Sequence, residues 1–212
     1  MTDRINKIVE LIPKCETLAD IGCDHGYISL GALKSGKVKK VIFSDISPLC
    51  LKKAQSNLCE YTNSGFALGI VSNGFTNLPF TETAVIAGMG GEETIKIISS
   101  CKNLPDNLVL QPMKNVDKVR EYIVGLGYKI TFDRVYCFDK KYYDFIVAVK
   151  GKDVLSKDEI LFGRTNLVSL NIDFLNRLRE QKKLLEKVLN SDISKNEADL
   201  KKELLESIKK YV

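Results

Sequence analysis

One short stretch of the chain carries the residue types most suited to chemistry, Asp20-Ile-Gly-Cys-Asp-His-Gly26. It begins within the last residues of a short β-type run, 18–21, and precedes a segment with helical periodicity. A glycine turn between a strand and a helix lets backbone N–H groups and the helix N-terminus approach a ligand closely. The stretch therefore predicts a cofactor-binding loop.

Asp24 discriminates between two classes of cofactor. A dinucleotide site would read G-x-G-x-x-G, and here Asp24 replaces the middle glycine. A carboxylate about 4 Å from a pyrophosphate would be repelled by roughly 1 kcal/mol in water and up to about 4 kcal/mol near a protein surface. The same carboxylate suits a cofactor that carries an ammonium and a sulfonium. We therefore expect S-adenosylmethionine rather than NAD, and an NAD-linked oxidoreductase is the less favoured alternative.

Polar residues follow the first three predicted strands. Asp20 is suited to accept from the methionine ammonium of the cofactor, or else from the N–H groups of its own loop. Asp45, 25 residues later, is suited to accept from both ribose hydroxyls, or else to form a local turn beside Ser47. Asn73 is placed to approach the adenine, unless Asn73-Gly74 is an ordinary turn.

Two further segments end the fourth and fifth predicted strands. Ala87-Gly-Met-Gly-Gly91 lies where ligands bind in open α/β sheets, and its glycines leave room for a flat base or for the transferred methyl group. A merely flexible loop is the alternative. The Gln111 amide is suited to contact a substrate base, or else to satisfy backbone groups near Pro112.

The order of predicted elements indicates an α/β fold. Short β-type runs at 18–21, 41–44, 67–71, 84–87 and 108–110 alternate with helical segments at 27–34, 48–61, 92–101 and 116–126. This βαβ series predicts a parallel, doubly wound sheet. The β-rich runs 128–137 and 142–150 are joined by four residues, which allows only an antiparallel connection. The prediction is a class I (Rossmann-like) methyltransferase sheet that ends in an antiparallel hairpin.

The pattern becomes helical from about Ser156 to the end of the chain. Apolar residues recur at helical spacing in two segments, from Leu167 through Leu170 to Val188 and from Leu200 to Tyr211. A break at 190–194 separates them, and Ser194 with Glu197 has capping-box spacing. We predict a methyltransferase domain at 1–152 and a C-terminal helical hairpin at 153–212. The charged face of this hairpin is either simply solvated or an RNA-contacting arm.

Composition narrows the class of protein. The chain has 212 residues, 44% hydrophobic residues and a formal net charge of +5, which fits an anionic partner. No apolar run approaches the roughly 18 residues that span a bilayer, so we expect a cytoplasmic protein without a membrane partner. Six cysteines without a C-x-x-C pair predict reduced, mostly buried thiols, and a single histidine argues against a metal site. Nothing predicts an obligate protein partner.

Several motifs in order carry a family resemblance: Leu18-Ala-Asp-Ile-Gly-Cys-Asp-His-Gly-Tyr27, Ile86-Ala-Gly-Met-Gly-Gly91, Leu110-Gln-Pro112, Gly127-Tyr128 and Tyr143-Asp-Phe-Ile-Val-Ala148. Together they resemble the bacterial tRNA adenine-22 N1-methyltransferase family over residues 1–150, and the helical tail is similar in kind. The resemblance implies tRNA as partner and a coiled-coil-like C-terminal domain that assists tRNA binding. Five residues depart from the usual family residues, which are Ser at Cys23, Ala at Gly26, Glu at Asp45, an acidic residue near Asn73 and Asn at Met113.

The resemblance implies that Asp24 is the catalytic residue. Methylation of N1 leaves a cationic base, which a nearby carboxylate favours, whereas the alternative is that Asp24 caps the following helix or only holds the cofactor. The predicted cofactor-binding residues are Asp20, Gly22, Cys23, His25, Gly26, Asp45, Ile46, Asn73, Gly74, Ala87, Gly88 and Met89. The predicted substrate-binding residues are Tyr27, Gly90, Gly91, Gln111 and Pro112.

Three functions remain open from the sequence. The favoured one is transfer of a methyl group from S-adenosylmethionine to N1 of adenosine 22 in tRNA. A class I methyltransferase that acts on another RNA or on a small molecule would need the same loop chemistry. A non-catalytic RNA-binding protein with a vestigial cofactor fold is the third. Because N1 lies on the Watson–Crick edge, the first function also predicts extrusion of the base, with Tyr27, Phe75, Tyr142 and Tyr143 as candidate stacking partners.

Overall fold

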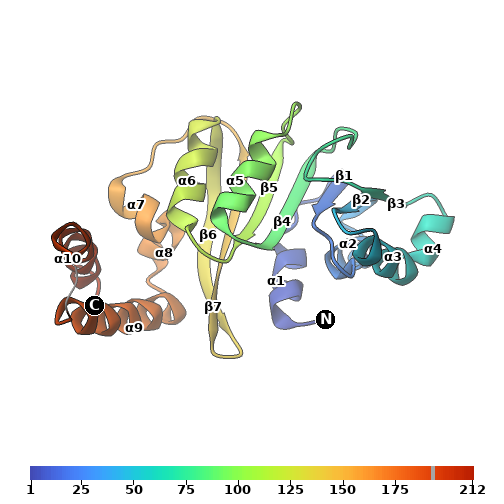
Figure 1. The fold of residues 1–212 in the computed structure, drawn as a ribbon. Helices are drawn as coiled ribbons and strands as arrows, with labels where there is room; N and C mark the ends of the chain where they lie inside the picture. Colours follow the sequence, from blue (N-terminus) through green and yellow to red (C-terminus); the bar gives the residue numbers. More distant parts are fainter. Residues whose placement is uncertain (192–193) are drawn as a thin grey trace.

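A computed structural model describes residues 1–191 and 194–212, and it contains a seven-stranded mixed sheet. The strand order is β3-β2-β1-β4-β5-β7-β6 (Figure 1). Strand β7 is antiparallel to both of its neighbours, and the other pairings are parallel. The strands are β1 (Cys15–Ile21), β2 (Val38–Asp45), β3 (Ala67–Val71), β4 (Thr83–Met89), β5 (Asn107–Pro112), β6 (Tyr128–Phe138) and β7 (Lys141–Lys150). The predicted sheet with an antiparallel hairpin is thus confirmed.

The helices lie in the predicted places, with one difference in the first half of the chain. The expected continuous helix 48–61 is wrong, because Leu58 leaves helical geometry (φ −107°, ψ 13°) while its side chain is fully buried. The helices are α1 (Asp3–Leu11), α2 (Tyr27–Lys34), α3 (Pro48–Asn57), α4 (Cys59–Asn63), α5 (Gly91–Ser99), α6 (Val116–Gly125), α7 (Lys157–Phe162), α8 (Arg164–Ser169), α9 (Ile172–Leu189) and α10 (Lys195–Lys209).

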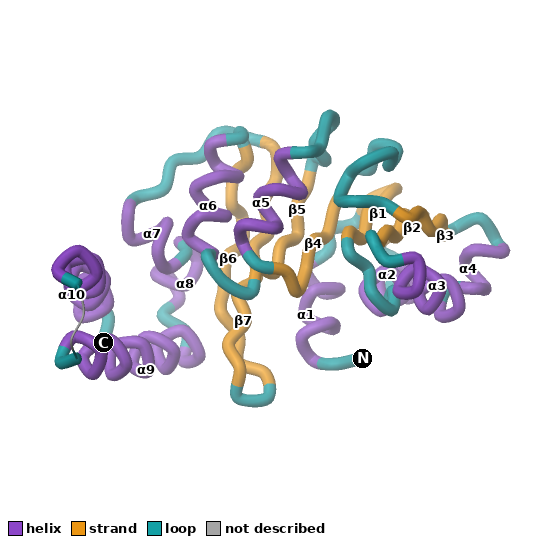
Figure 2. Tube along the Cα trace, in the orientation of Figure 1, coloured by secondary structure: helices purple, strands orange, loops and turns teal. Residues whose placement is uncertain are grey.

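Helices cover both faces of the sheet, as Figure 2 shows. Alternate residues of one strand point to opposite faces. Leu18 and Val85 therefore pack in a core with α1, α2 and α3, whereas Ala19 and Ile86 pack in a second core with α5 and α6. From β1 the chain adds β2 and β3 on one side, and it then adds β4 and β5 on the other side. The strand order therefore reverses between β1 and β4, and doubly wound sheets bind ligands in the crevice at this switch point.

The C-terminal tail, residues 153–212, is helical as predicted and is fastened to the edge strand β6. The edge of a sheet presents N–H groups that need acceptors or a cover. Four of them, one on Ile130 before the β6 bulge and three on alternating residues beyond it, donate to side chains of the tail. These bonds are Ile130 N to Asp153 Oδ2 (3.0 Å), Asp133 N to Thr165 Oγ1 (3.1 Å), Val135 N to Asn166 Oδ1 (2.9 Å) and Cys137 N to Asp173 Oδ2 (3.0 Å).

The helices of the tail are shorter and more numerous than the apolar spacing predicted. The segment expected to run through Leu167 and Leu170 into α9 is interrupted at Leu170, which has a left-handed backbone (φ 43°) and ends α8. Ser194 caps α10 by accepting from Glu197 N (3.3 Å). The predicted break at 190–194 includes residues 192 and 193, which lie outside the described residues. The boundary between domains at 152/153 stays a prediction.

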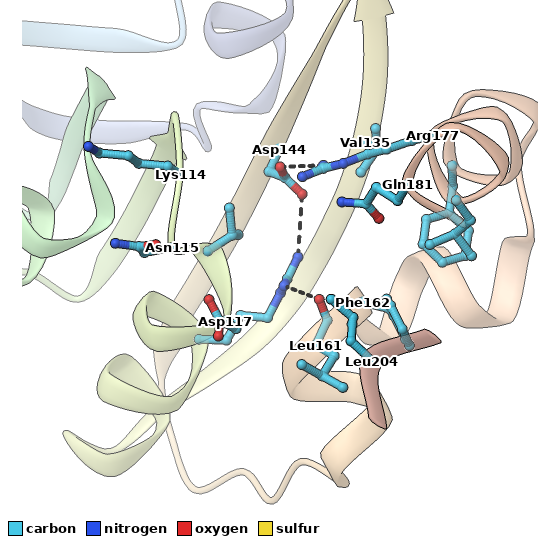
Figure 3. Close-up of a pocket in the computed structure, with 14 residues that line it drawn as sticks. Lys114, Asn115, Asp117, Val135, Asp144, Leu161, Phe162, Arg177, Gln181 and Leu204 are labelled. Atoms are coloured by element: carbon cyan, nitrogen blue, oxygen red, sulfur yellow. Dashed lines mark hydrogen bonds and ion pairs between the residues drawn. The ribbon is translucent and has the colours of Figure 1, made fainter. Parts of the chain in front are cut away.

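A buried charge network connects the sheet to the tail (Figure 3). Arg120 of α6 forms two bonds with Asp133 of β6, at 2.7 and 3.0 Å, and its Nη1 donates to the carbonyls of Ile160 and Leu161 at 3.0 and 3.2 Å. These carbonyls belong to the last turn of α7, where helical acceptors lack partners. Asp144 of β7 lies between the guanidinium groups of Arg120 (3.6 Å) and of Arg177 in α9 (2.5 Å).

The cysteines are less buried than predicted. All six are free thiols, but only Cys23 is buried; Cys15, Cys50, Cys101 and Cys137 are half-buried, and Cys59 is exposed. A short apolar run around a cysteine therefore does not ensure that its side chain is buried. Cys50 lies in α3 and Cys59 in α4, and both side chains reach the surface of the protein. None of the helices in the described ranges is both long and apolar enough to cross a membrane.

Candidate active site

A cavity of about 270 Å³ lies at the carboxyl edge of the sheet, where β1 and β4 are neighbours. It brings together the glycine loop after β1 and the end of β4, as the sequence predicts for a cofactor site. Helix α1, which the sequence did not implicate, adds two residues. The lining residues are Arg4, Ile5, Gly22, Cys23, Asp24, His25, Tyr27, Ile28, Ala87, Gly88 and Met89.

The glycine loop has the geometry of a ligand cradle. Gly22 and Gly26 both have φ near 71°, a left-handed backbone that favours glycine. The N–H groups of Gly22 and Cys23 donate to the Ser44 carbonyl at 2.8 and 2.9 Å, which ties the loop to the end of β2. A Cβ on Gly22 would collide with the Met89 side chain, so the loop and the end of β4 approach each other as closely as glycine allows. Burial raises the pKa of the Cys23 thiol, so this cysteine is an inert wall residue.

Asp24 presents its carboxylate to the cavity. Its backbone is left-handed (φ 48°), and its side chain is 70% exposed. Helix α2 begins after Gly26, and no described side chain caps it. The alternative that Asp24 is a helix cap is therefore wrong. The carboxylate lies 3.8 Å from His25 Nε2 and remains accessible to a ligand.

Asp45 holds the loop through its two carboxylate oxygens. Oδ2 accepts from Asp24 N at 3.0 Å, and Oδ1 accepts from Ser47 N at 2.9 Å. The local turn beside Ser47 that the sequence left as an alternative is thus present. A carboxylate has about four acceptor sites, so two remain for the predicted ribose hydroxyls. Ile46, the next residue, is 68% exposed at the same edge.

Asp20 is buried at the end of β1 rather than open to the cavity. Its side chain is held by Ser29, whose N–H and hydroxyl donate to Oδ2 at 3.1 and 2.6 Å. Burial raises its pKa to about 6, the Ser29 bonds oppose that change, and the charge of Asp45 adds to it. A buried carboxylate with a raised pKa gains from a cation brought nearby, which is how a cofactor ammonium would act.

This raised pKa predicts a dependence of stability on pH. From about pH 4 to 6 the folded protein retains a proton that the unfolded chain releases, so the free energy of unfolding decreases as the pH rises. We expect Asp20→Asn to flatten this decrease and to stabilise the ligand-free protein at pH 7 by about 3 kcal/mol, since the pKa is raised by roughly two units and each unit is worth ~1.4 kcal/mol. Urea unfolding at pH 4.5, 5.5 and 7 measures it. As a control, Ser29→Ala removes bonds that lower the pKa and should extend the decrease to higher pH. A less stable Asp20→Asn protein at pH 7 would contradict this interpretation.

His25 and Tyr27 form an aromatic surface at the mouth of the cavity. Their rings stack with centroids 5.8 Å apart and 14° between planes. The His25 carbonyl accepts from Asn57 Nδ2 at 3.0 Å, and Tyr27 is 44% exposed. An exposed stacked pair beside a cofactor site is suited to receive a planar base.

The three glycines at and after the end of β4 each face a different neighbour. A Cβ on Gly88 would lie 3.2 Å from Arg4 Nη1, and one on Gly90 would lie 3.3 Å from the Lys114 side chain. A Cβ on Gly91 would lie 2.5 Å from the Asn115 carbonyl oxygen, and Gly91 N donates to the Lys114 carbonyl at 2.9 Å. Gly91 is thus explained by close backbone packing, and the substrate roles of Gly90 and Gly91 stay predictions.

Other predicted site residues lie outside this cavity. Asn73 lines a separate small cavity with residues of α5, and Gly74 (φ 61°) packs beside Ile97. Gln111 is 1% exposed, and its Oε1 accepts from Arg4 Nη1 at 2.7 Å. Pro112 is buried and pairs with Met89. The adenine contact of Asn73 and the base contact of Gln111 therefore stay predictions.

The residues present fit S-adenosylmethionine better than a dinucleotide. Acidic groups at the ends of β1 and β2 surround a loop whose glycines leave its backbone open, and the Asp24 carboxylate occupies the position at which a pyrophosphate would need a neutral glycine. Among the described residues no group of three potential ligands is arranged to hold a metal ion.

Comparisons with known proteins agree with this site. A family model described as a methyltransferase domain matches residues 1–146. A Mycoplasma pneumoniae protein provisionally named as a tRNA methyltransferase is 34% identical over 174 residues, which cover 77% of this chain and 79% of that protein. The tRNA (adenine(22)-N(1))-methyltransferase of Bacillus subtilis is 27% identical over 178 residues, or 79% and 73% of the two chains.

A solved structure extends the likeness to the whole chain. M. capricolum TrmK in complex with S-adenosyl-homocysteine, its natural cofactor product, matches with a TM-score of 0.89 and 25% identity, covering 100% of this chain and 97% of that one. The shared region includes the helical tail as well as the sheet. The chain therefore belongs to the methyltransferase-domain family and, within it, to the bacterial tRNA (adenine-22 N1)-methyltransferase family.

Proposed function

We propose that this protein transfers a methyl group from S-adenosylmethionine to N1 of adenosine 22 in tRNA. One observation carries the proposal: the glycine loop, with its Asp24 carboxylate, and the end of β4 line a single cavity at the switch point of the sheet. The B. subtilis relative is named for this reaction, and the M. capricolum relative binds the demethylated cofactor.

We assign different residues to bind the methionine, ribose and adenine parts of the cofactor. We assign the glycine loop to the methionine end, with the buried Asp20 carboxylate behind it as counter-charge for the ammonium, and the remaining acceptor sites of Asp45 to the ribose. Exposed Ile46 offers an apolar contact for the adenine. When bound, S-adenosylmethionine supplies the electrophilic methyl group.

The substrate side needs orientation more than it needs a base. Adenine N1 already carries an in-plane lone pair, so alignment with the methyl–sulfur axis is the main requirement. We assign Asp24 to hold the exocyclic amine or N1 region and to offset the positive charge that the base acquires. Its carboxylate lines the cavity and is 70% exposed, with His25 Nε2 at 3.8 Å, so it is accessible for this role.

The base must leave its helix to react. N1 lies on the Watson–Crick edge, so a paired or stacked adenosine is inaccessible until it is extruded. We assign the stacked His25–Tyr27 pair to receive the extruded base, since stacking on aromatic side chains is worth about 1–3 kcal/mol per base. We place the enzyme in the cytoplasm, where its tRNA substrate is made and used.

Primer extension tests the proposed reaction. A methyl group at N1 blocks base pairing and stops reverse transcriptase one nucleotide before the modified position. We expect a stop at adenosine 22 after incubation of a tRNA transcript with the full chain and S-adenosylmethionine. A transcript with guanosine at position 22 is the matched control and should be read through. Full-length extension of the adenosine transcript, with cofactor binding verified, would disprove the assignment.

A further inference from the structure

Arg4 is the cationic side chain that α1 contributes to the cofactor cavity. Its Nη1 donates to Gln111 Oε1 at 2.7 Å, and its guanidinium carbon lies 5.7 Å from the centroid of the Tyr143 ring. Gly88 has no side chain at the point where a Cβ would come within 3.2 Å of Nη1. Contacts from β4, β5 and β7 therefore hold one guanidinium at the cavity wall.

Most of the hydrogen-bonding capacity of this guanidinium is unused. Arginine has five N–H donors and no acceptor. One of them is bonded to Gln111, and within residues 1–191 and 194–212 Arg4 takes part in no ion pair. The buried amide of Gln111 therefore orients Arg4 without neutralising it. A fixed, unneutralised guanidinium in a cavity is suited to bind an oxyanion in bidentate fashion.

The charges around the cavity complement a ligand that contains both signs. Asp24 lines the cavity, and Asp20 and Asp45 lie just behind the loop. The two carboxylates behind the loop match the ammonium and sulfonium of the cofactor, and all three carboxylates oppose any anionic group. An anionic group is present in both ligands of the proposed reaction, as the methionine carboxylate of the cofactor and as the phosphates of RNA. Among the described residues that line this cavity, Arg4 is the permanently charged cation that could bind either anionic group.

We propose that Arg4 is the oxyanion-binding residue of the active-site cavity. This inference rests on the proposed function, since it assumes that both ligands enter this cavity. It assigns Gln111 and Tyr143 as positioning residues, which act by orienting the Arg4 guanidinium. It also explains Gly88, because any side chain at that position would crowd the guanidinium.

Titration calorimetry with two cofactor forms tests the carboxylate as the source of the oxyanion. The probes are S-adenosylmethionine and decarboxylated S-adenosylmethionine, which keeps both cationic groups. If Arg4 holds the carboxylate, Arg4→Met should weaken binding of S-adenosylmethionine about 10- to 100-fold, the worth of a charge-assisted hydrogen bond. It should leave the affinity for the decarboxylated form unchanged, and Arg4→Lys should restore part of the loss.

Salt-dependent tRNA binding tests the phosphate as the source. If Arg4 holds a phosphate, Arg4→Met should leave both cofactor affinities unchanged. It should weaken tRNA binding and reduce the slope of log K against log salt by about one.

Lys7→Met is the matched control for both arms. Lys7 lies one turn further along α1 and packs on the neighbouring hairpin residue Tyr136, with Nζ 4.6 Å from the ring centroid, but it does not line the cavity. We expect it to change neither cofactor discrimination nor the salt slope.

Three results would overturn the inference: unchanged binding of all ligands by Arg4→Met, equal losses for both cofactor forms, or the same effect from Lys7→Met. Failure of the wild-type protein to bind S-adenosylmethionine would instead contradict the proposed function.

Discussion

Asp24→Asn is expected to lower kcat by about 100-fold while cofactor affinity stays within about threefold of wild type, because removing one preorganised electrostatic group typically costs 10²–10³ in rate. The carboxylate is exposed at the cavity and is not needed to cap α2. Asparagine tolerates the left-handed backbone at this position, so the loop should keep its shape. Single-turnover methylation of a tRNA transcript, with calorimetry for the cofactor, measures both quantities.

Asp139→Asn provides the matched control for this variant. Asp139 is also an exposed aspartate with a left-handed backbone (φ 49°), in the turn between β6 and β7. It should retain wild-type turnover. If Asp24→Asn also turned over at the wild-type rate with intact cofactor binding, a chemical role for Asp24 would be excluded.

Arg120→Met is expected to lower the free energy of unfolding by about 3–5 kcal/mol, because it leaves buried carboxylates without their counter-charge. Asp133 is 1% exposed and Asp144 is 6% exposed. Burial opposes the charged form of Arg120, but the two carboxylates outweigh burial and raise its pKa. The variant also leaves the last carbonyls of α7 without their donor. Urea unfolding, monitored by circular dichroism, measures the loss.

Two further variants distinguish the cost in stability of leaving a buried charge unpaired from the cost of losing an ion pair in general. Arg164→Met removes a partly exposed arginine that pairs with Asp153 and Glu159 at 3.0 and 2.6 Å. Asp153 is 7% exposed, so the loss should exceed the ~1 kcal/mol of a surface pair but stay below that of the fully buried Arg120. The double variant Arg120→Met/Asp133→Asn should be more stable than Arg120→Met, because one uncompensated charge is gone. A cost for Arg120→Met no larger than that of Arg164→Met would show that the network is not important for stability.

The sheet and the glycine loop were predictable from the sequence because both depend on local signals. Period-two apolar runs and glycine turns mark strands and their ends, and a four-residue link restricts the last two strands to antiparallel pairing. The meeting of Gly22 with Met89 follows from the same logic, since parallel strands place their carboxyl ends at one edge. These features need no knowledge of how distant side chains pack.

The parts that the sequence did not reveal depend on packing between distant segments. Arg4 lies on an ordinary amphipathic helix, and only the docking of α1 against β5 and β7 brings it 2.7 Å from Gln111, 107 residues away. The acceptors that cover β6 come from Asp153, Thr165, Asn166 and Asp173, which look like turn and cap residues in the sequence. A buried polar residue in a helical tail, such as Asn166 at 0% exposure, becomes informative only once its partner strand is known.

The central claim is that this chain methylates N1 of adenosine 22 in tRNA. Its most direct test is mass mapping of bulk tRNA that lacks the modification, after incubation with the full chain and S-adenosylmethionine bearing a deuterated methyl group. We predict labelled 1-methyladenosine in the nuclease fragment that contains position 22 and in no other fragment. Label in a different nucleoside or at a different position, or none despite bound cofactor, would contradict the account.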